Sequence, residues 1–288
     1  MNLNQQLLAI HLTAGMGAKA ARAVVTAVTA VQVPTIYPWP LDLILSFGDQ
    51  RSHHLIRRTY SSAVERAQQW STPYMTYFDA YYPGRLREIY DAPLVLFYQG
   101  HLEALRLPSL SVVGTRAATP YGLAVLRSLL PDVVRQDVAI VSGLAKGIDV
   151  MAHQMTLAQR GVPIAVIGTG IDVAYPKAHH HLQTQIGEQG LVLSEYPPGT
   201  GPQKSHFPAR NRIIAGLSSA TLVVEAKQHS GSLITANFAL QENRDVLAVP
   251  GTIFSATAQG THELIQLGAK LVAKPTDILE SVQNLDTI

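Results

Sequence analysis

Short apolar runs alternate with amphipathic stretches through the C-terminal part of the chain, from Ser109 onward. The runs have the length of buried strands, and the stretches between them have helical periodicity. Continuous apolar strands separated by helices predict a mainly parallel sheet covered on both faces, an α/β, doubly wound, Rossmann-like domain over residues 109–288. The expected strands are Leu110–Val113, Val138–Ser142, Ile164–Gly168, Leu191–Ser194, Ala220–Glu225, Asp245–Val249 and Ala269–Val272. The expected helices include Tyr121–Val134, Asp149–Gln159, His179–Gln189 and Ser232–Glu242.

Residues 1–70 have a different pattern, with apolar residues at helical spacing and short Gly or Pro breaks between the stretches. This pattern predicts a small all-α domain. Residues 71–108 are irregular and rich in Tyr, Phe and Pro, with one strand-like run at Leu94–Tyr98. We expect them to form a bridging segment packed on the larger domain.

The composition is that of a globular protein, with 47% hydrophobic residues, but only 15% of the residues are charged. Typical domains have about 25%, so much of the surface is expected to be polar but uncharged or to be covered by a partner. The chain has no cysteine, which excludes disulfides and cysteine-ligated metal sites. It also lacks a basic signal-peptide start and an apolar run of about 18 residues, so we expect a cytoplasmic protein with no membrane contact.

The net charge of +2 is unevenly distributed. Residues 1–72 contain six Lys or Arg against three Asp or Glu, whereas the remainder contains 16 against 17. The large domain therefore cannot bind an anion through its bulk charge. An anion site there must be local, built from a few cations, backbone amides and helix N-termini.

Gly, Ser and Thr follow most of the expected strands, as in Gly114-Thr115, Ser142-Gly143, Gly168-Thr169-Gly170, Ser230-Gly231-Ser232 and Pro250-Gly251-Thr252. Because ligands of such sheets bind at the carboxyl ends of the strands, we expect these loops to share one rim.

The first of these loops, Gly114-Thr115-Arg116, stands where a dinucleotide-binding domain has its phosphate loop. No second glycine follows until Gly122, so the Gly-x-Gly-x-x-Gly pattern is absent and neither NAD nor FAD is expected as a cofactor. Arg116 suits a charge-assisted contact with a single phosphate, although a plain surface turn would have the same sequence.

The stretch from Lys204 to Arg212 contains no acidic residue and combines Phe207 with Arg210, Asn211 and Arg212. Cations that follow phosphates and rings that stack on bases are the means by which proteins hold single-stranded nucleic acid. Alternatively, Phe207 belongs to the core and the arginines pair with acids such as Glu195 and Glu225. We expect both in part, with one arginine buried for structural reasons.

Three further patterns have a structural and a functional interpretation. Asp149 either caps a helix or forms an acid-base couple with His153, and capping is favoured. Ser230 and Ser232 open a helix as an ordinary N-cap or as an anion cradle. His179-His180-His181 lacks further ligands at metal-binding spacing, so it is expected to be a solvated helix start, and no metal site is predicted.

Taken in order, these motifs resemble the bacterial DNA-processing protein A family, also called Smf, over residues 7–282. The motifs are Gly114-Thr115-Arg116, Ser142–Asp149, Gly170–Pro176, Ser194–Gly199, Phe207–Arg212, Glu225-Ala226 with Ser230–Ala236, and Ala248–Gly251. The resemblance implies a SAM-like N-terminal domain before an extended Rossmann domain. It also implies a cytoplasmic, non-enzymatic protein of natural transformation that needs no cofactor.

Members of this family bind and protect incoming single-stranded DNA, help to load the RecA recombinase, and form homodimers through the Rossmann domain. The resemblance places DNA contacts on Gly114, Thr115, Arg116, Lys204, Phe207, Arg210, Asn211 and Arg212, with Ser142, Gly143, Ser230 and Ser232 lining the same pocket. The dimer contact is expected near Leu264 and Ile265.

The sequence departs from the family pattern at three places. Many members continue into a winged-helix domain, which is expected to be absent because this chain stops at Ile288. His262 replaces a common Asn, and Thr115 replaces a commoner Ser but keeps the hydroxyl.

A rival hypothesis is a Rossmann-type nucleotide hydrolase that cuts an N-glycosidic bond with Glu225 as the acid. Such enzymes carry a Pro-Gly-Gly-x-Gly-Thr loop, whereas Ala226–Ser232 has no such pattern.

Overall fold

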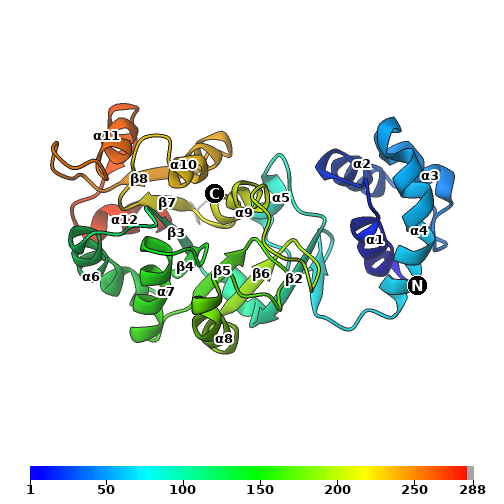
Figure 1. The fold of residues 1–288 in the computed structure, drawn as a ribbon, viewed down its shortest axis with the longest axis horizontal. Coiled ribbons are helices and arrows are strands. Elements are labelled where there is room, and N and C mark those ends of the chain that lie inside the picture. The colour runs from blue at the N-terminus through cyan, green and yellow to red at the C-terminus, as the bar shows by residue number, and fades with distance from the viewer. Residues whose placement is uncertain (284–288) are drawn as a thin grey trace. The chain divides into compact units, whose positions relative to one another are not determined.

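The computed structural model describes residues 1–283, which divide into two compact units (Figure 1). The smaller unit comprises Met1–Tyr82 and Tyr90–Tyr98, and the larger comprises Pro83–Ile89 with the chain from Gln99 onward. The predicted end of the large domain at residue 288 lies outside the described residues.

The smaller unit is a group of four helices followed by an antiparallel strand pair. The helices are α1 (Leu3–Leu12), α2 (Ala18–Thr29), α3 (Leu41–Phe47) and α4 (His53–Gln68). Helices α1 and α4 pack together through buried residues such as Leu7 and Ile56. Strand β1 (Tyr74–Thr76) pairs with β2 (Val95–Gly100), with Tyr74 opposite Phe97.

The larger unit is built on seven parallel strands in the order β6-β5-β4-β3-β7-β8-β9. Their bounds are β3 (Ser109–Val113), β4 (Ala139–Ser142), β5 (Pro163–Ile167), β6 (Leu191–Ser194), β7 (Ala220–Val223), β8 (Asp245–Ala248) and β9 (Lys270–Leu271). The helices are α5 (Gly84–Glu88), α6 (Pro120–Val134), α7 (Ile148–Ala158), α8 (His180–Gln189), α9 (His206–Leu217), α10 (Gly231–Gln241), α11 (Gln259–Gln266) and α12 (Pro275–Gln283). The predicted doubly wound α/β class with a mainly parallel sheet is confirmed.

Both faces of the parallel sheet are covered, as the alternation of side chains along β3 shows. Leu110 and Val112 belong to the core cluster that they form with residues of α6, α7 and α12. Ser111, between them, points to the other face, where its hydroxyl donates to the carbonyl of Ile214 in α9 at 2.7 Å. Helix α10 packs beside α9 on this second face.

The chain reverses its direction of strand addition at β3. Strands β4, β5 and β6 are added on one side of it, and the chain then crosses through α9 to place β7 on the other side. In sheets of this type, ligands bind in the crevice at the carboxyl ends of the strands where the order reverses.

Candidate functional site

A cavity of about 680 Å³ lies at the carboxyl ends of β3, β4, β5 and β7. Its walls come from the turn after β3, the starts of α7, α9 and α10, and the loops that follow β5 and β7. The polar and aromatic lining residues are Thr115, Arg116, Asp149, Tyr175, Lys204, Phe207, Arg210, Asn211, Lys227, Ser230, Ser232 and Thr235. Arg116, after β3, and Lys204, before α9, therefore line the same cavity.

The turn after β3 is held between two neighbouring elements. The Thr115 amide donates to the Glu225 carbonyl at 2.8 Å, and the Thr115 carbonyl accepts from the Ile148 amide at 3.2 Å. At Gly147 φ is +81°, and an added Cβ would lie 2.3 Å from the Thr115 carbonyl oxygen. This close approach fixes the backbone while the Arg116 side chain stays exposed at the cavity.

The stretch from Phe207 to Arg212 forms the first half of α9. Arg210 is only 5% exposed, and its guanidinium donates to the carbonyls of Gly143, at 2.7 Å, and Val166. An added Cβ at Gly143 would lie 2.5 Å from this guanidinium. Arg210 thus ties α9 to β4 and β5, and it is a buried structural arginine of the kind expected from the sequence.

Asp149 and His153 lie beside Arg210 under the cavity floor. Burial raises the pKa of Asp149 to about 6, against the opposing effect of the Arg210 charge. Burial also lowers the pKa of His153 to about 3, and Arg210 acts in the same direction. The Asp149 carboxylate accepts the amides of Gly143, at 3.2 Å, and Ala145, at 3.4 Å. It therefore holds the loop before α7, whose N-cap is Gly147, and does not form a couple with His153.

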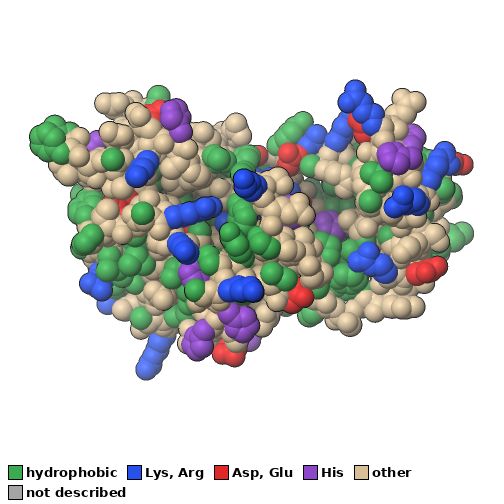
Figure 2. Space-filling view, viewed as in Figure 1, with side chains coloured by type: hydrophobic (Ala, Val, Ile, Leu, Met, Phe, Trp, Pro, Cys, Tyr) green, Lys and Arg blue, Asp and Glu red, His purple; other side chains and the backbone are tan. Residues whose placement is uncertain are grey.

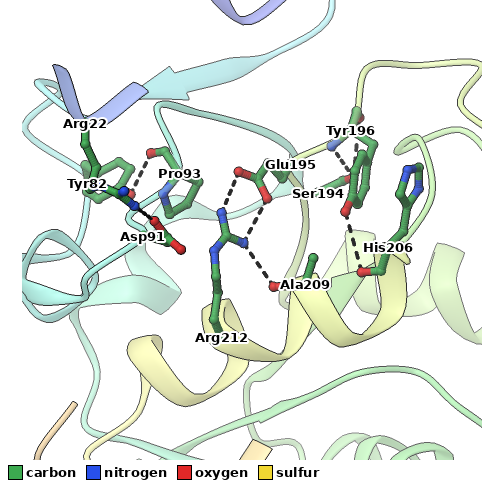
Figure 3. Close-up of polar contacts among 10 residues, drawn as sticks. All are labelled: Arg22, Tyr82, Asp91, Pro93, Ser194, Glu195, Tyr196, His206, Ala209 and Arg212. Atoms are coloured by element: carbon green, nitrogen blue, oxygen red, sulfur yellow. Dashed lines mark hydrogen bonds and ion pairs between the residues drawn. The ribbon is translucent and has the colours of Figure 1, made fainter. Parts of the chain in front are cut away.

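Arg212 lies outside the cavity lining and pairs with Glu195 (Figure 3). Its guanidinium donates to both carboxylate oxygens of Glu195, at 2.7 and 2.9 Å, and to the Ala209 carbonyl at 3.0 Å. On the same loop, Tyr196 stacks on His206 with ring centroids 3.8 Å apart. These contacts fasten the loop after β6 to α9. The same close-up shows Arg22 paired with Asp91 in the smaller unit.

Three exposed cations, Arg116, Lys204 and Lys227, line the cavity together with the aromatic pair Tyr175 and Phe207. The two rings lie 5.3 Å apart, and Tyr175 is 48% exposed. Figure 2 shows Lys and Arg side chains gathered around the middle of the face that carries α7, α9 and α10. Asp149 is the sole acidic residue of the lining, and it is buried.

Helix α10 begins at the cavity with Ser230, Gly231 and Ser232. The Ser230 side chain occupies the N-cap position without bonding to a helix amide, and its hydroxyl lies 2.9 Å from that of Ser232. The Leu233 amide donates to the Ser230 carbonyl at 3.1 Å, and the amides of Gly231 and Ser232 precede the first helical hydrogen bonds. This end of α10 can therefore accept an anion.

The remaining predicted residues have structural surroundings. Ser142 is fully buried, where its hydroxyl donates to the Val112 carbonyl at 2.6 Å, and Gly143 is buried against Arg210. The side chain of Leu264 is buried and that of Ile265 is half-buried. The ring of His262 bonds to the backbone of Gly251, with Nε2 3.0 Å from the carbonyl oxygen.

Glu225 belongs to a second cavity, of about 450 Å³, and not to the first. It is 3% exposed, and its carboxylate accepts from the Thr119 amide at 3.0 Å, the Thr119 hydroxyl at 2.6 Å and the Thr257 hydroxyl at 3.0 Å. It pairs with neither Arg210 nor Arg212, contrary to one alternative considered from the sequence.

The lining residues that were not predicted as contacts include the aromatic Tyr175 and the cation Lys227. Tyr175 lies within the motif Gly170–Pro176, and Lys227 lies in the loop compared with that of the hydrolases. Both residues lie in loops that follow the carboxyl ends of strands, and this position was the available signal for a contact role. Among residues 1–283, no group of three or more His, Asp or Glu side chains could hold a metal ion. No helix in this range is both long and apolar enough to cross a bilayer.

The fold and the cavity define a Rossmann-like protein with a cationic, aromatic-lined crevice at the strand reversal. The model of the family described as DNA recombination-mediator protein A matches residues 73–283. The chain is 52% identical to DNA processing protein DprA of Streptococcus pneumoniae over 207 residues, 72% of this chain and 73% of that protein. It is 45% identical to Protein Smf of Escherichia coli over 204 residues, 70% of this chain and 54% of that protein. The chain belongs to the DNA recombination-mediator protein A family.

Two solved structures extend the comparison. The X-ray structure of DNA processing protein A from Streptococcus pneumoniae has a TM-score of 0.89 and 40% sequence identity, covering 98% of this chain and 99% of that one. The structure of DNA processing protein A from Helicobacter pylori has a TM-score of 0.66 and 27% identity, covering 74% of this chain and 97% of that one. It is described as showing that protein's single-stranded DNA binding mode.

Proposed function

We propose that this protein captures single-stranded DNA in the cavity at the strand reversal, without reading the base sequence. The observation that carries the proposal is the combination of Arg116, Lys204 and Lys227 with the exposed Tyr175 and the half-buried Phe207 in one crevice. Exposed cations neutralise phosphates, and rings support bases, with stacking worth about 1 to 3 kcal/mol per base. The Helicobacter pylori relative, described as binding single-stranded DNA, supports this assignment.

The predicted contacts divide into two groups. Gly114, Thr115, Arg116, Lys204, Phe207, Asn211, Ser230 and Ser232 line the cavity and are proposed to contact DNA. Arg210 lines it only as part of the floor, while Ser142, Gly143 and Arg212 lie outside it, and these four residues are proposed to hold the walls in place.

The phosphate position proposed here lies between the turn after β3 and the start of α10. Arg116 supplies the charge on one side, and the first amides of α10 supply donors on the other. A helix N-terminus carries a partial positive charge of about +0.5, so both sides attract the same anion.

Binding measured by fluorescence anisotropy tests the cavity. We expect Arg116→Ala and Lys204→Ala each to raise Kd for single-stranded DNA several-fold. Each should also lower the slope of log Kd against log salt by about 0.7, the value for one lost phosphate contact on a single strand. Arg135→Ala is the matched control, because Arg135 caps the far end of α6 and pairs with Asp132. Equal affinity for single- and double-stranded DNA, or unimpaired cavity variants, would contradict the proposal.

As a recombination mediator, the protein is proposed to act on the captured strand in two ways. It shields the strand from nucleases, and it helps to load the RecA recombinase as a homodimer formed through the larger unit. Exonuclease digestion and RecA filament formation on a strand already covered by a single-strand-binding protein measure these two effects. Arg116→Ala should weaken both in proportion to its loss of DNA affinity.

The hydrolase hypothesis has no comparable support, because the Glu225 carboxylate is occupied by two threonines and lies outside the cationic cavity. Incubation with nucleoside monophosphates should release no free base. We therefore propose a binding protein and not an enzyme.

A further inference from the structure

The exposed face of α4 in the smaller unit is strongly basic. Ile56, Tyr60, Ala63, Val64 and Ala67 form the buried face of this helix. The opposite face carries Arg57, Arg58 and Arg66, which are all exposed. Arg51, in the turn before the helix, and His54, in its first turn, continue this face and are also exposed. Figure 2 shows Lys and Arg side chains over the part of the smaller unit that α4 occupies in Figure 1.

These arginines have no acidic partner, unlike four other arginines of the described chain. Arg22, Arg135, Arg212 and Arg244 each form an ion pair. Within residues 1–283, none of the four arginines on the α4 face, Arg51, Arg57, Arg58 and Arg66, forms one. Like charges gathered on one exposed face repel one another, so an anionic partner would stabilise the row.

The other side chains on this face are short and polar. Ser61 and Ser62 are exposed between Arg58 and Arg66, where their hydroxyls can donate to phosphate oxygens. One acid, Glu65, interrupts the row. From Arg57 to Arg66 the helix rises about 14 Å, a length over which one strand of a duplex carries about four phosphates.

We propose that this face of α4 is a second nucleic-acid-binding surface, which holds the sugar-phosphate backbone of DNA, separately from the cavity in the larger unit. The chemistry of the face selects this partner. A membrane-binding helix needs an apolar face to insert, but the apolar face of α4 is buried against α1. A protein interface has an apolar centre, and no large apolar side chain is exposed on α4.

The surface fits the phosphate backbone of a single strand and of a duplex, because both offer a row of anionic oxygens. The proposal goes beyond capture in the cavity, since it places DNA on the smaller unit as well. It also accounts for the charge of residues 1–72, which contain six Lys or Arg against three Asp or Glu.

The test uses the full chain with Arg57→Gln and Arg58→Gln combined. We expect Kd for single-stranded or duplex DNA of about 40 nucleotides to rise about 3- to 10-fold near 0.1 M salt. The salt slope should fall by about 1 to 2, as two backbone contacts are lost. The charge-retaining pair Arg57→Lys with Arg58→Lys should restore most of the affinity. Thermal melting should match the parent protein because both side chains are exposed, and Arg66→Gln alone is the fallback variant.

Two controls separate this surface from bulk charge and from the cavity. Arg127→Gln with Arg135→Gln removes the same charge from one exposed position of α6 and from its exposed C-cap. Unchanged Kd and slope in the α4 pair, or a loss no greater than in the α6 pair, would overturn the proposal. The proposal would also be overturned if the α4 pair lost binding to anionic lipid vesicles while its Kd for DNA stayed unchanged. Arg116→Ala tests the cavity separately, so that either surface can fail while the other stands.

Discussion

Asp149 and His153 lie one turn apart in α7, and burial shifts the pKa of each. The two shifts have opposite effects on the free energy of unfolding as the pH falls. The pKa of His153 falls from 6.5 to about 3, so the unfolded chain binds a proton on acidification before the folded chain does. This difference lowers the free energy of unfolding below about pH 6.5. The pKa of Asp149 rises from 3.8 to about 6, so the folded chain binds that proton first and gains stability between about pH 6 and pH 4.

We therefore expect Asp149→Asn to make the protein more sensitive to acid. The variant keeps an oxygen that can accept the Gly143 amide but loses the compensating protonation. Its free energy of unfolding should fall more steeply than that of the parent between about pH 6.5 and pH 4, by about 2 kcal/mol over the range. Urea titrations at a series of pH values measure this difference. Parallel curves for the two proteins would show that Asp149 does not titrate there.

Single residues also show where sequence patterns stop being informative. The stretch from Lys204 to Arg212 was predicted as a contact surface with one structural arginine. In the structure two arginines, Arg210 and Arg212, bond to neighbouring parts of the fold. Which cation stays exposed depends on helix phase. Arg210 turns toward β4 and β5, Arg212 toward Glu195, and Lys204 precedes the helix. That phase follows from where α9 begins, and α9 was not among the expected helices.

At the scale of elements, the cavity depends on the contact between two loops. Gly147 begins α7 with φ at +81° and lies against the backbone of Thr115 and Arg116. Side chains are disfavoured at such φ values, and the neighbouring atoms are backbone, which cannot turn aside as a flexible side chain can.

Gly147→Ala should therefore displace the turn after β3. We expect a loss of about 1 to 3 kcal/mol in the free energy of unfolding and a larger loss of DNA affinity than stability alone explains. Denaturant titration and anisotropy measure the two effects. Gly84→Ala is the matched control, since no atom lies within 4 Å of its added Cβ. Equal behaviour of the two variants would show that the loop contact has no part in binding.

Strands and most helices could be predicted because each is a contiguous segment with its own pattern. The strand predicted at Leu191–Ser194 has the same bounds in the structure, and the helix predicted at Tyr121–Val134 differs by one residue. Helix α9 was missed because its apolar positions Ile213, Ile214 and Leu217 follow a first half of mixed polar and apolar residues with no helical period. Pro208 in the first turn was the available signal for its start. Which loops meet across the sheet is a property of strand order, and no local pattern contains it.

At the scale of the whole molecule, strand β9 ends the parallel order of the larger unit. Near it, Leu267 is 75% exposed and Leu271 is 45% exposed, whereas Leu264, expected near a dimer contact, is buried. An edge strand with exposed apolar side chains favours pairing with another chain. The proposed homodimer is therefore better placed on Leu267 and Leu271 than on Leu264.

We expect Leu267→Asp to weaken dimerisation at least about tenfold, because two buried carboxylates would face each other across a symmetric contact. Leu240→Asp is the control, a change of the same kind at an exposed leucine of α10. Analytical ultracentrifugation gives the association constants.

A dimer offers two cavities to one strand of DNA. Leu267→Asp should therefore also bind a long oligonucleotide more weakly. Its affinity for a short oligonucleotide, which fills a single cavity, should be unchanged. A monomer that retains full affinity for the long strand would show that binding does not depend on two cavities, and an unaltered dimer would place the interface elsewhere.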